Sequence, residues 1–166
     1  MQDNSKIKAK DKDTFYKIMM VKLEGLLSSE PDWLANMANA AALLFNNLDD
    51  INWAGFYLLK GDELVLGPFQ GKIACTRIKP GRGVCGTAAA ERKTQLVQDV
   101  HLFPGHIACD AASRSEIVVP IEVDGSLYGV LDIDSPITDR FDETDRKYLE
   151  LYVQKLNKYI KWDLSR

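Results

Sequence analysis

An α+β domain with a central antiparallel β-sheet is the fold class that the sequence predicts. Three observations predict it: apolar residues recur at helical spacing near both ends of the chain, β-rich runs lie between them, and a tight-turn signal joins two of those runs. We expect the N- and C-terminal helices to cover one face of the sheet, because amphipathic helices bury their apolar side. The long central segment should then cover a pocket on the other face, since loops of that length are usually functional.

The N-terminal part is predicted to hold a flexible tail and two helices. Residues 1–12 are polar and lysine-rich without an apolar core, so they predict a tail rather than a signal peptide. We expect a single domain over residues 13–166, because a chain of 166 residues is long enough to bury one hydrophobic core. The apolar residues of 14–27 follow a helical period, and Pro31 lies near the first turn of a second helix.

Four β-strands are predicted after these helices. The β-rich runs cover residues 51–59, 63–66, 114–123 and 126–133. The last two runs are joined by Asp124-Gly125, a hairpin signal because glycine tolerates the positive φ that such a turn requires. The glycine-rich segment 67–110 lies between the strand pairs and contains one short helical run, 84–92.

A last helix is predicted to begin at Asp142. The Asp142 side chain can accept hydrogen bonds from the free N–H groups of the first turn, and Asp145 adds favourable negative charge there. The apolar face of this helix consists of Leu149, Tyr152, Val153, Leu156 and Ile160.

The composition excludes several classes of protein. A net charge of −3 with scattered basic residues argues against nucleic acid as a partner, and no apolar stretch is long enough to span a membrane. We therefore expect a cytoplasmic protein. The three cysteines are an odd number, unlike a secreted disulfide framework. All three lie within residues 75–109, a glycine-rich stretch, which favours thiols with a chemical role.

The run from Gly81 to Gly86 has the G-x-G-x-x-G spacing of dinucleotide-binding loops. It lacks the βαβ context of such loops and follows Pro80, so the simpler interpretation is a turn that leads into a short helix. In that interpretation Cys85 lies in the first helical turn, where the helix dipole favours a thiolate.

A metal site is a second hypothesis for the same region. His101, His106 and Cys109 could join Cys75 or Cys85 around an ion, but their spacing matches no familiar zinc pattern. The alternative places both histidines on a solvated loop. We predict neither a metal nor another cofactor.

Acidic residues form a further cluster of candidates. Asp132 and Asp134 are two apart on a predicted strand and therefore share one face, and the hairpin returns this strand beside Glu116. The alternative is a solvated strand end, because charged residues are mostly exposed. If the three carboxylates converge, repulsion should raise at least one pKa, so that one protonated acid donates a proton while its neighbours hold a cation.

Two aromatic residues occupy one face of the first predicted strand. Trp53 and Tyr57 are four residues apart, so their rings lie on the same side of the sheet. They are either core aromatics or the wall of a pocket for an apolar group of a ligand.

Six stretches together resemble the GAF-type free methionine-(R)-sulfoxide reductases. They are Asn52 to Tyr57, Leu66 to Gly71, Gly81 to Ala90, Phe103 to Asp110, Ser113 to Pro120 and Gly129 to Pro136. The resemblance covers about residues 30–160 and is specific, because ordinary GAF domains lack these three cysteines and this acidic strand ending. It implies a GAF fold, in which an antiparallel sheet carries helices on one side and a loop-covered pocket on the other.

The resemblance also implies roles for the cysteines. Cys109 matches the nucleophile of the family and Cys75 the main resolving cysteine. Cys85 matches a secondary or alternative resolving thiol.

The acids and aromatic residues are matched in the same way. Glu116, Asp132 and Asp134 resemble the substrate-binding acids. Our own hypothesis from the residues is that Glu116 is the preferred proton donor. Trp53 resembles the aromatic residue that faces the methyl group, and Tyr57 lies beside it on the same face.

The resemblance implies reduction of free methionine-(R)-sulfoxide through a cysteine sulfenic acid and a disulfide, with a thioredoxin-type reductant closing the cycle. It further implies a homodimer. The alternative is a GAF sensor module that binds a small ligand without turnover, because a fold alone does not determine function.

Overall fold

The computed structural model describes residues 5–107 and 111–162. Within these residues the helices are α1 (Lys12–Leu27), α2 (Trp33–Asn47), α3 (Gly83–Glu91), the short 3-10 helix η1 (Val100–Leu102) and α4 (Glu143–Tyr159). The strands are β1 (Trp53–Lys60), β2 (Glu63–Gly71), β3 (Arg77–Ile78), β4 (Gln95–Val97), β5 (Ser115–Val123) and β6 (Ser126–Ser135). Among the described residues, no helix combines the length and the apolar character needed to cross a membrane.

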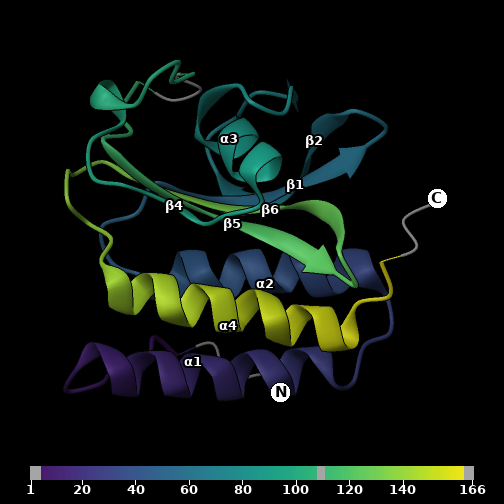
Figure 1. Cartoon of the computed structure of the whole chain (residues 1–166). Helices are drawn as coiled ribbons and strands as arrows, with labels where there is room; N and C mark the ends of the chain where they lie inside the picture. The colour runs from purple at the N-terminus through teal and green to yellow at the C-terminus, as the bar shows by residue number, and fades with distance from the viewer. Residues whose placement is uncertain (1–4, 108–110, 163–166) are drawn as a thin grey trace.

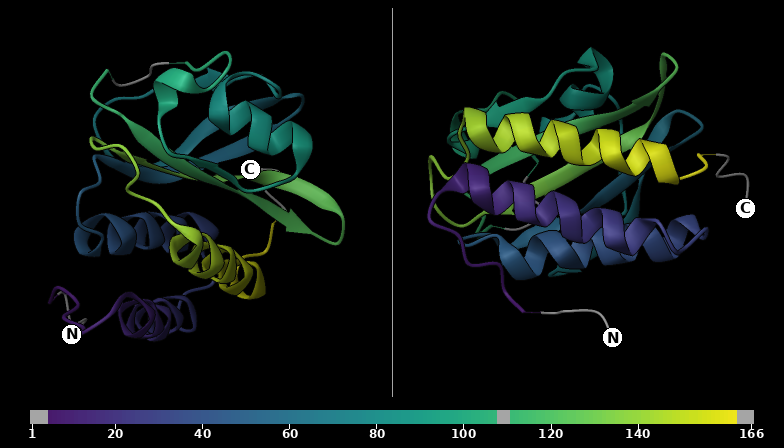
Figure 2. Two further views of the ribbon diagram at one scale, coloured as in Figure 1. Left: turned by 60° about the vertical axis from the view of Figure 1, so that its left-hand side comes forward. Right: turned by 90° about the horizontal axis from the view of Figure 1, so that it is seen from below.

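The described strands form one antiparallel sheet in the order β3-β2-β1-β6-β5-β4. Helices α2 and α4 pack on one face of this sheet, and α1 lies across both of them on the outside (Figures 1 and 2). Helix α3 and the loops around it cover the opposite face (Figure 1). The predicted α+β architecture, with terminal helices on one side and the central segment on the other, is confirmed.

The start of α4 is anchored as the sequence predicts. Asp142 caps the helix by accepting from the backbone N–H of Asp145, and the Asp145 side chain accepts from the backbone N–H of Asp142, which completes a capping box. Asp145 is fully buried and also accepts a hydrogen bond of 2.6 Å from the Tyr16 hydroxyl. Lys12 pairs with the same carboxylate. The first turns of α1 and α4 are therefore joined through one buried acid.

The segment before α1 contributes to the helical core. Ile7 is buried, and its backbone N–H donates to the Asn47 side chain at 2.8 Å. Flexibility over residues 1–12 and a domain over residues 13–166 stay predictions.

The central segment contains more secondary structure than its sequence predicts. Strands β3 and β4 and helix η1 were not predicted, because two or three residues are too few to show a period. Strand β2 continues five residues past Leu66, although glycine and proline follow there. The pairing of β1 with β2 shifts register between Gly55 and Tyr57, so the Gly67-Pro68 pair lies in a bulge, where a residue without an N–H is tolerated.

The glycine-rich run before α3 is a turn that leads into a helix. Gly81 and Gly83 have positive φ values of 81° and 63°. A Cβ atom on Gly86 would lie 2.4 Å from the backbone oxygen of Lys79, so only glycine lets the helix approach this turn so closely. The run follows a two-residue strand of an antiparallel sheet rather than opening a βαβ unit, which favours the structural interpretation over a dinucleotide site.

Replacing Gly86 by alanine should lower the free energy of unfolding by about 1–3 kcal/mol, because the added methyl group overpacks against backbone. The matched control is Gly25→Ala, also within a helix, where a Cβ meets nothing within 4 Å. That variant should be unchanged or stabilised by up to about 1 kcal/mol. Urea denaturation measures both. Equal effects of the two substitutions would contradict the close-approach argument.

Candidate active site

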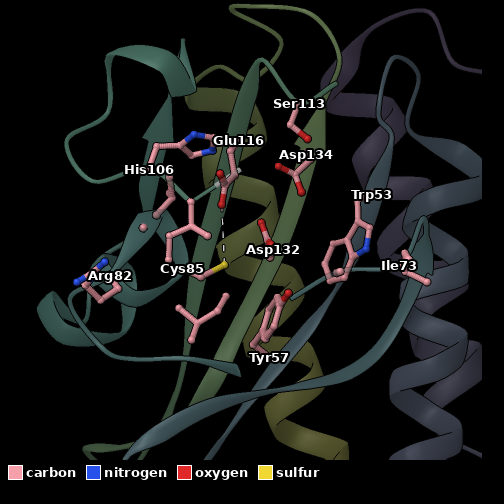
Figure 3. Close-up of a pocket in the computed structure, with 15 residues that line it drawn as sticks. Trp53, Tyr57, Ile73, Arg82, Cys85, His106, Ser113, Glu116, Asp132 and Asp134 are labelled. Atoms are coloured by element: carbon pink, nitrogen blue, oxygen red, sulfur yellow. Dashed lines mark hydrogen bonds between the residues drawn. The ribbon is translucent and has the colours of Figure 1, made fainter. Parts of the chain in front are cut away.

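A pocket lies between the sheet and the N-terminal end of α3 (Figure 3). Residues from β1, β3, α3, β5 and β6, from the segments before β3 and α3, and from the loop between η1 and β5 line it. They are Trp53, Tyr57, Ile73, Ala74, Ile78, Arg82, Gly83, Val84, Cys85, His106, Ile107, Ser113, Glu116, Asp132 and Asp134. All five residues predicted as acidic or aromatic substrate contacts belong to this lining. The structure therefore brings together residues that lie up to 81 positions apart, from Trp53 to Asp134.

Strand register places the three acids side by side. Glu116 on β5 pairs directly with Asp134 on β6, and Asp132 is two residues away on the same face. Glu116 and Asp132 are each 6% exposed, so the alternative of a solvated strand end is wrong for these two. Figure 3 shows the three carboxylates turned into one pocket.

Burial changes the acidity of this cluster. Burial raises the pKa of Glu116 well above its usual value, and the charges of Asp132 and Asp134 raise it further. Burial also raises the pKa of Asp132 to about 6. The raised pKa favours the protonated form of Glu116, whereas Asp132 ionises at a pH of about 6. One group can donate a proton while the other attracts a cation, as the sequence predicts for converging carboxylates.

Cys85 lies in the first turn of α3, but its thiol is not activated. The side chain is 4% exposed, and its Sγ donates to the Glu116 carboxyl at 3.8 Å. Burial raises the pKa of Cys85 well above its usual value, and the negative charges of Asp132 and Glu116 raise it further. The expectation that the helix dipole favours a thiolate here is therefore wrong, because desolvation beside two acids opposes it.

The two aromatic residues form the wall of the pocket on the β1 side. The rings of Trp53 and Tyr57 stack with centroids 5.9 Å apart, and both side chains are almost fully buried. Trp53 Nε1 donates to the backbone oxygen of Lys72 at 3.1 Å, and the Tyr57 hydroxyl donates to that of Cys75 at 2.9 Å. They therefore serve both as pocket wall and as anchors for the segment that covers the pocket.

The three cysteines differ in their burial and in their position in the fold. Cys85 is a free and buried thiol, whereas Cys75 is half-buried in the segment between β2 and β3. Cys109 lies outside the described residues. Ile107 and Ser113, which bracket it in the sequence, both line the pocket.

The histidine-centred metal hypothesis gains no support from the described residues. His101 contacts Asp99 at 3.0 Å on the surface, and His106 lines the pocket, where burial lowers its pKa. Neither histidine belongs to a cluster of three metal-ligating side chains in the described part of the chain.

Some lining residues were not singled out as contacts by the sequence. Ser113 accepts a hydrogen bond of 3.1 Å from the Asn52 side chain, and Ile73 and Ile107 lie at the covering segments. No local pattern marks them, because they enter the pocket only through loop packing. The cavity between all these groups measures about 40 Å³, room for a few water molecules.

The fold and this pocket are those of a GAF domain, and the family model of the GAF domain matches residues 31–160. Two relatives of similar length are free methionine-R-sulfoxide reductases. The Escherichia coli protein is 54% identical over 150 residues, covering 90% of this chain and 91% of the relative. The Saccharomyces cerevisiae protein is 45% identical over 156 residues, covering 89% and 87%.

The comparison of structures agrees with the comparison of sequences. The Neisseria meningitidis free methionine-R-sulfoxide reductase, solved in complex with its substrate, superposes with a TM-score of 0.92 at 46% identity and covers 99% of each chain. This chain belongs to the free methionine-R-sulfoxide reductases of the GAF domain family.

The buried acids should make the protein less stable as pH rises. The folded-state pKa of Asp132 is about 6 against 3.8 for the free side chain, so the folded state binds more protons and stability falls as pH rises through this window. Asp132→Asn should therefore raise the free energy of unfolding by about 1–3 kcal/mol at about pH 8 and by little at about pH 4. Urea denaturation across this range measures the difference.

Asp62→Asn in the exposed β1–β2 turn is the matched control, and it should change the free energy of unfolding by less than about 0.5 kcal/mol at either pH. Parallel pH profiles for the wild type and Asp132→Asn would contradict the raised pKa.

Proposed function

We propose that this protein reduces free methionine-(R)-sulfoxide to methionine, with Cys109 as the nucleophile and the buried acids acting on the substrate. The observation that carries the proposal is the pocket itself, in which a buried acid with a strongly raised pKa, a second buried acid with a pKa of about 6 and two stacked aromatic rings meet. Turnover of the free (R)-sulfoxide in an assay coupled to a dithiol reductant tests it directly. Binding without turnover would instead favour a sensor module.

The first chemical step is attack by the Cys109 thiolate on the sulfoxide sulfur. The sulfur–oxygen bond of the substrate breaks, the oxygen ends on Cys109 as a sulfenic acid, and methionine leaves. The substrate sulfur is reduced by two electrons and the cysteine sulfur is oxidised by two.

Glu116 is the proposed proton donor to the sulfoxide oxygen. Its raised pKa favours the protonated form that can donate, and protonation of the oxygen makes the sulfur more electrophilic. Acids near a thiol oppose thiolate formation, as they do at Cys85. The acids are therefore assigned to the substrate rather than to activation of the nucleophile.

Asp132 and Asp134 are the proposed site for the α-ammonium group. Their carboxylates share the pocket face with Glu116, so the amino acid's ammonium and its sulfoxide can be held together. Peptide-bound methionine has no α-ammonium, which accounts for selection of the free amino acid. Trp53 and Tyr57 would pack against the methyl group and side-chain carbons.

The second step regenerates the reduced enzyme. A second thiol attacks the Cys109 sulfenic acid, a disulfide forms and water leaves. Cys75 is favoured for this role because it is half-buried in the covering segment, whereas Cys85 is enclosed and protonated. A thioredoxin-type dithiol would then reduce the disulfide. We further propose that the protein forms a homodimer and is located in the cytoplasm.

The sensor alternative receives less support than the enzyme. A sensor needs neither three cysteines nor a buried acid with a raised pKa beside two further acids, and both features occur in this chain. The two curated relatives compared above carry the name of the enzyme.

Cys109→Ser should abolish turnover, because a hydroxyl lacks the nucleophilicity needed for attack at sulfur. The matched control is Cys85→Ser, which removes a buried, protonated thiol and should retain at least about a tenth of the wild-type kcat. The coupled assay with free methionine-(R)-sulfoxide measures both. Residual turnover in Cys109→Ser together with loss in Cys85→Ser would move the nucleophile to Cys85.

Asp134→Asn should raise KM for the free amino acid about tenfold or more with a smaller change in kcat, because a charge-assisted contact to the ammonium is lost. Glu116→Gln is the contrasting variant and should lower kcat more than it raises KM. Steady-state kinetics separate the two effects. An unchanged KM in Asp134→Asn would remove this residue from ammonium binding.

A further inference from the structure

Three ligating side chains at the base of the pocket lie within reach of a single ion. One ligand atom from each of Cys85, Glu116 and Asp132 lies within 4.8 Å of the other two, and all three residues are buried. They come from α3, β5 and β6, so tertiary packing assembles the cluster. Figure 3 shows the sulfur and the two carboxyl groups facing the same space.

An independent observation indicates a missing positive partner at this point. Asp132 is only 6% exposed, and its buried Oδ1 has no hydrogen-bond partner among residues 5–107 and 111–162. A buried acceptor without a partner destabilises the folded protein, so proteins retain one where a ligand supplies the contact. A substrate ammonium would satisfy this oxygen, but it gives no reason for a sulfur ligand beside it.

The distances and donor types match a borderline-soft divalent ion. Zinc binds sulfur at about 2.3 Å and carboxylate oxygen at about 2.0 Å, which places such ligands about 3.5 Å apart in a tetrahedron. The Cys85 Sγ and Glu116 carboxyl oxygen are 3.8 Å apart. Thiolate ligands select zinc-like ions over magnesium and calcium, which prefer oxygen alone.

We propose that Cys85, Glu116 and Asp132 form a binding site for a divalent transition-metal ion of the zinc class. Three protein ligands leave the fourth position to water, and binding replaces the thiol and carboxyl protons, which pass to solvent. This site goes beyond the proposed reductase activity. Because Asp132 also belongs to the proposed ammonium site, a bound ion competes with the amino acid for it.

Co²⁺ is a suitable probe, because a thiolate ligand gives it a charge-transfer absorption. The protein used is the full chain carrying Cys75→Ser and Cys109→Ser, in which Cys85 is the remaining thiol. Titration with Co²⁺ should produce the charge-transfer band, and Zn²⁺ should displace it. Adding Cys85→Ser should abolish the band. Far-ultraviolet circular dichroism checks that each variant is folded.

The carboxylate ligands are tested in the same background. Glu116→Gln and Asp132→Asn should each raise the Kd for Co²⁺ at least about tenfold, since each removes a direct ligand. Asp134→Asn is the matched control, because it removes a carboxylate from the same pocket without removing a proposed ligand. It should raise the Kd for Co²⁺ less than Glu116→Gln or Asp132→Asn does. Free methionine should raise the apparent Kd.

Several results would overturn the proposal. One is the absence of a charge-transfer band in the folded protein with Cys85 as its single thiol. Another is an equal loss of affinity in Asp134→Asn and Asp132→Asn, which would indicate general negative charge rather than coordination. The Co²⁺ titration measures metal binding without turnover. If no binding is found, the proposed reductase activity is still tested independently, by the turnover assay in metal-free buffer.

Discussion

The burial of acidic side chains on one face of a β-sheet is the constraint on which the chemistry of this pocket depends. Alternation along β5 and β6 directs apolar side chains such as Ile117 and Ile133 into the helical core, while Glu116 and Asp132 face the pocket. The same two strands thus contribute to stability on one side and to chemistry on the other. Pairing of Glu116 with Asp134 in the strand register fixes their backbones as direct neighbours.

Burying these acids costs free energy, and it also shifts their pKa values in a way that can serve the chemistry of the pocket. A carboxyl group taken out of water beside other carboxylates becomes harder to ionise, and Glu116 keeps its proton for that reason. The same field suppresses ionisation of the Cys85 thiol. Such a pocket suits a ligand with a positively charged group that Asp132 can attract once it has ionised. The same ligand can carry a second group that takes a proton from Glu116.

The aromatic residues connect this base to the segment that covers it. Trp53 and Tyr57 belong to β1, and their side chains donate hydrogen bonds to the backbone oxygens of Lys72 and Cys75, respectively. The half-buried Cys75 lies on that segment, whereas the buried Cys85 lies on helix α3, which is packed against the sheet.

Local sequence determined the helices, the Asp124-Gly125 hairpin and the capped start of α4, because periodicity and capping act over a few neighbouring residues. It also determined that Asp132 and Asp134 share a face, since strand geometry has a period of two. Only the tertiary structure decided the extension of β2 through a bulge, the short strands β3 and β4, and the acidity of Cys85. Helix position alone predicts a thiolate there, but β5 and β6 place buried acids against the sulfur, and desolvation by residues distant in sequence outweighs a local dipole.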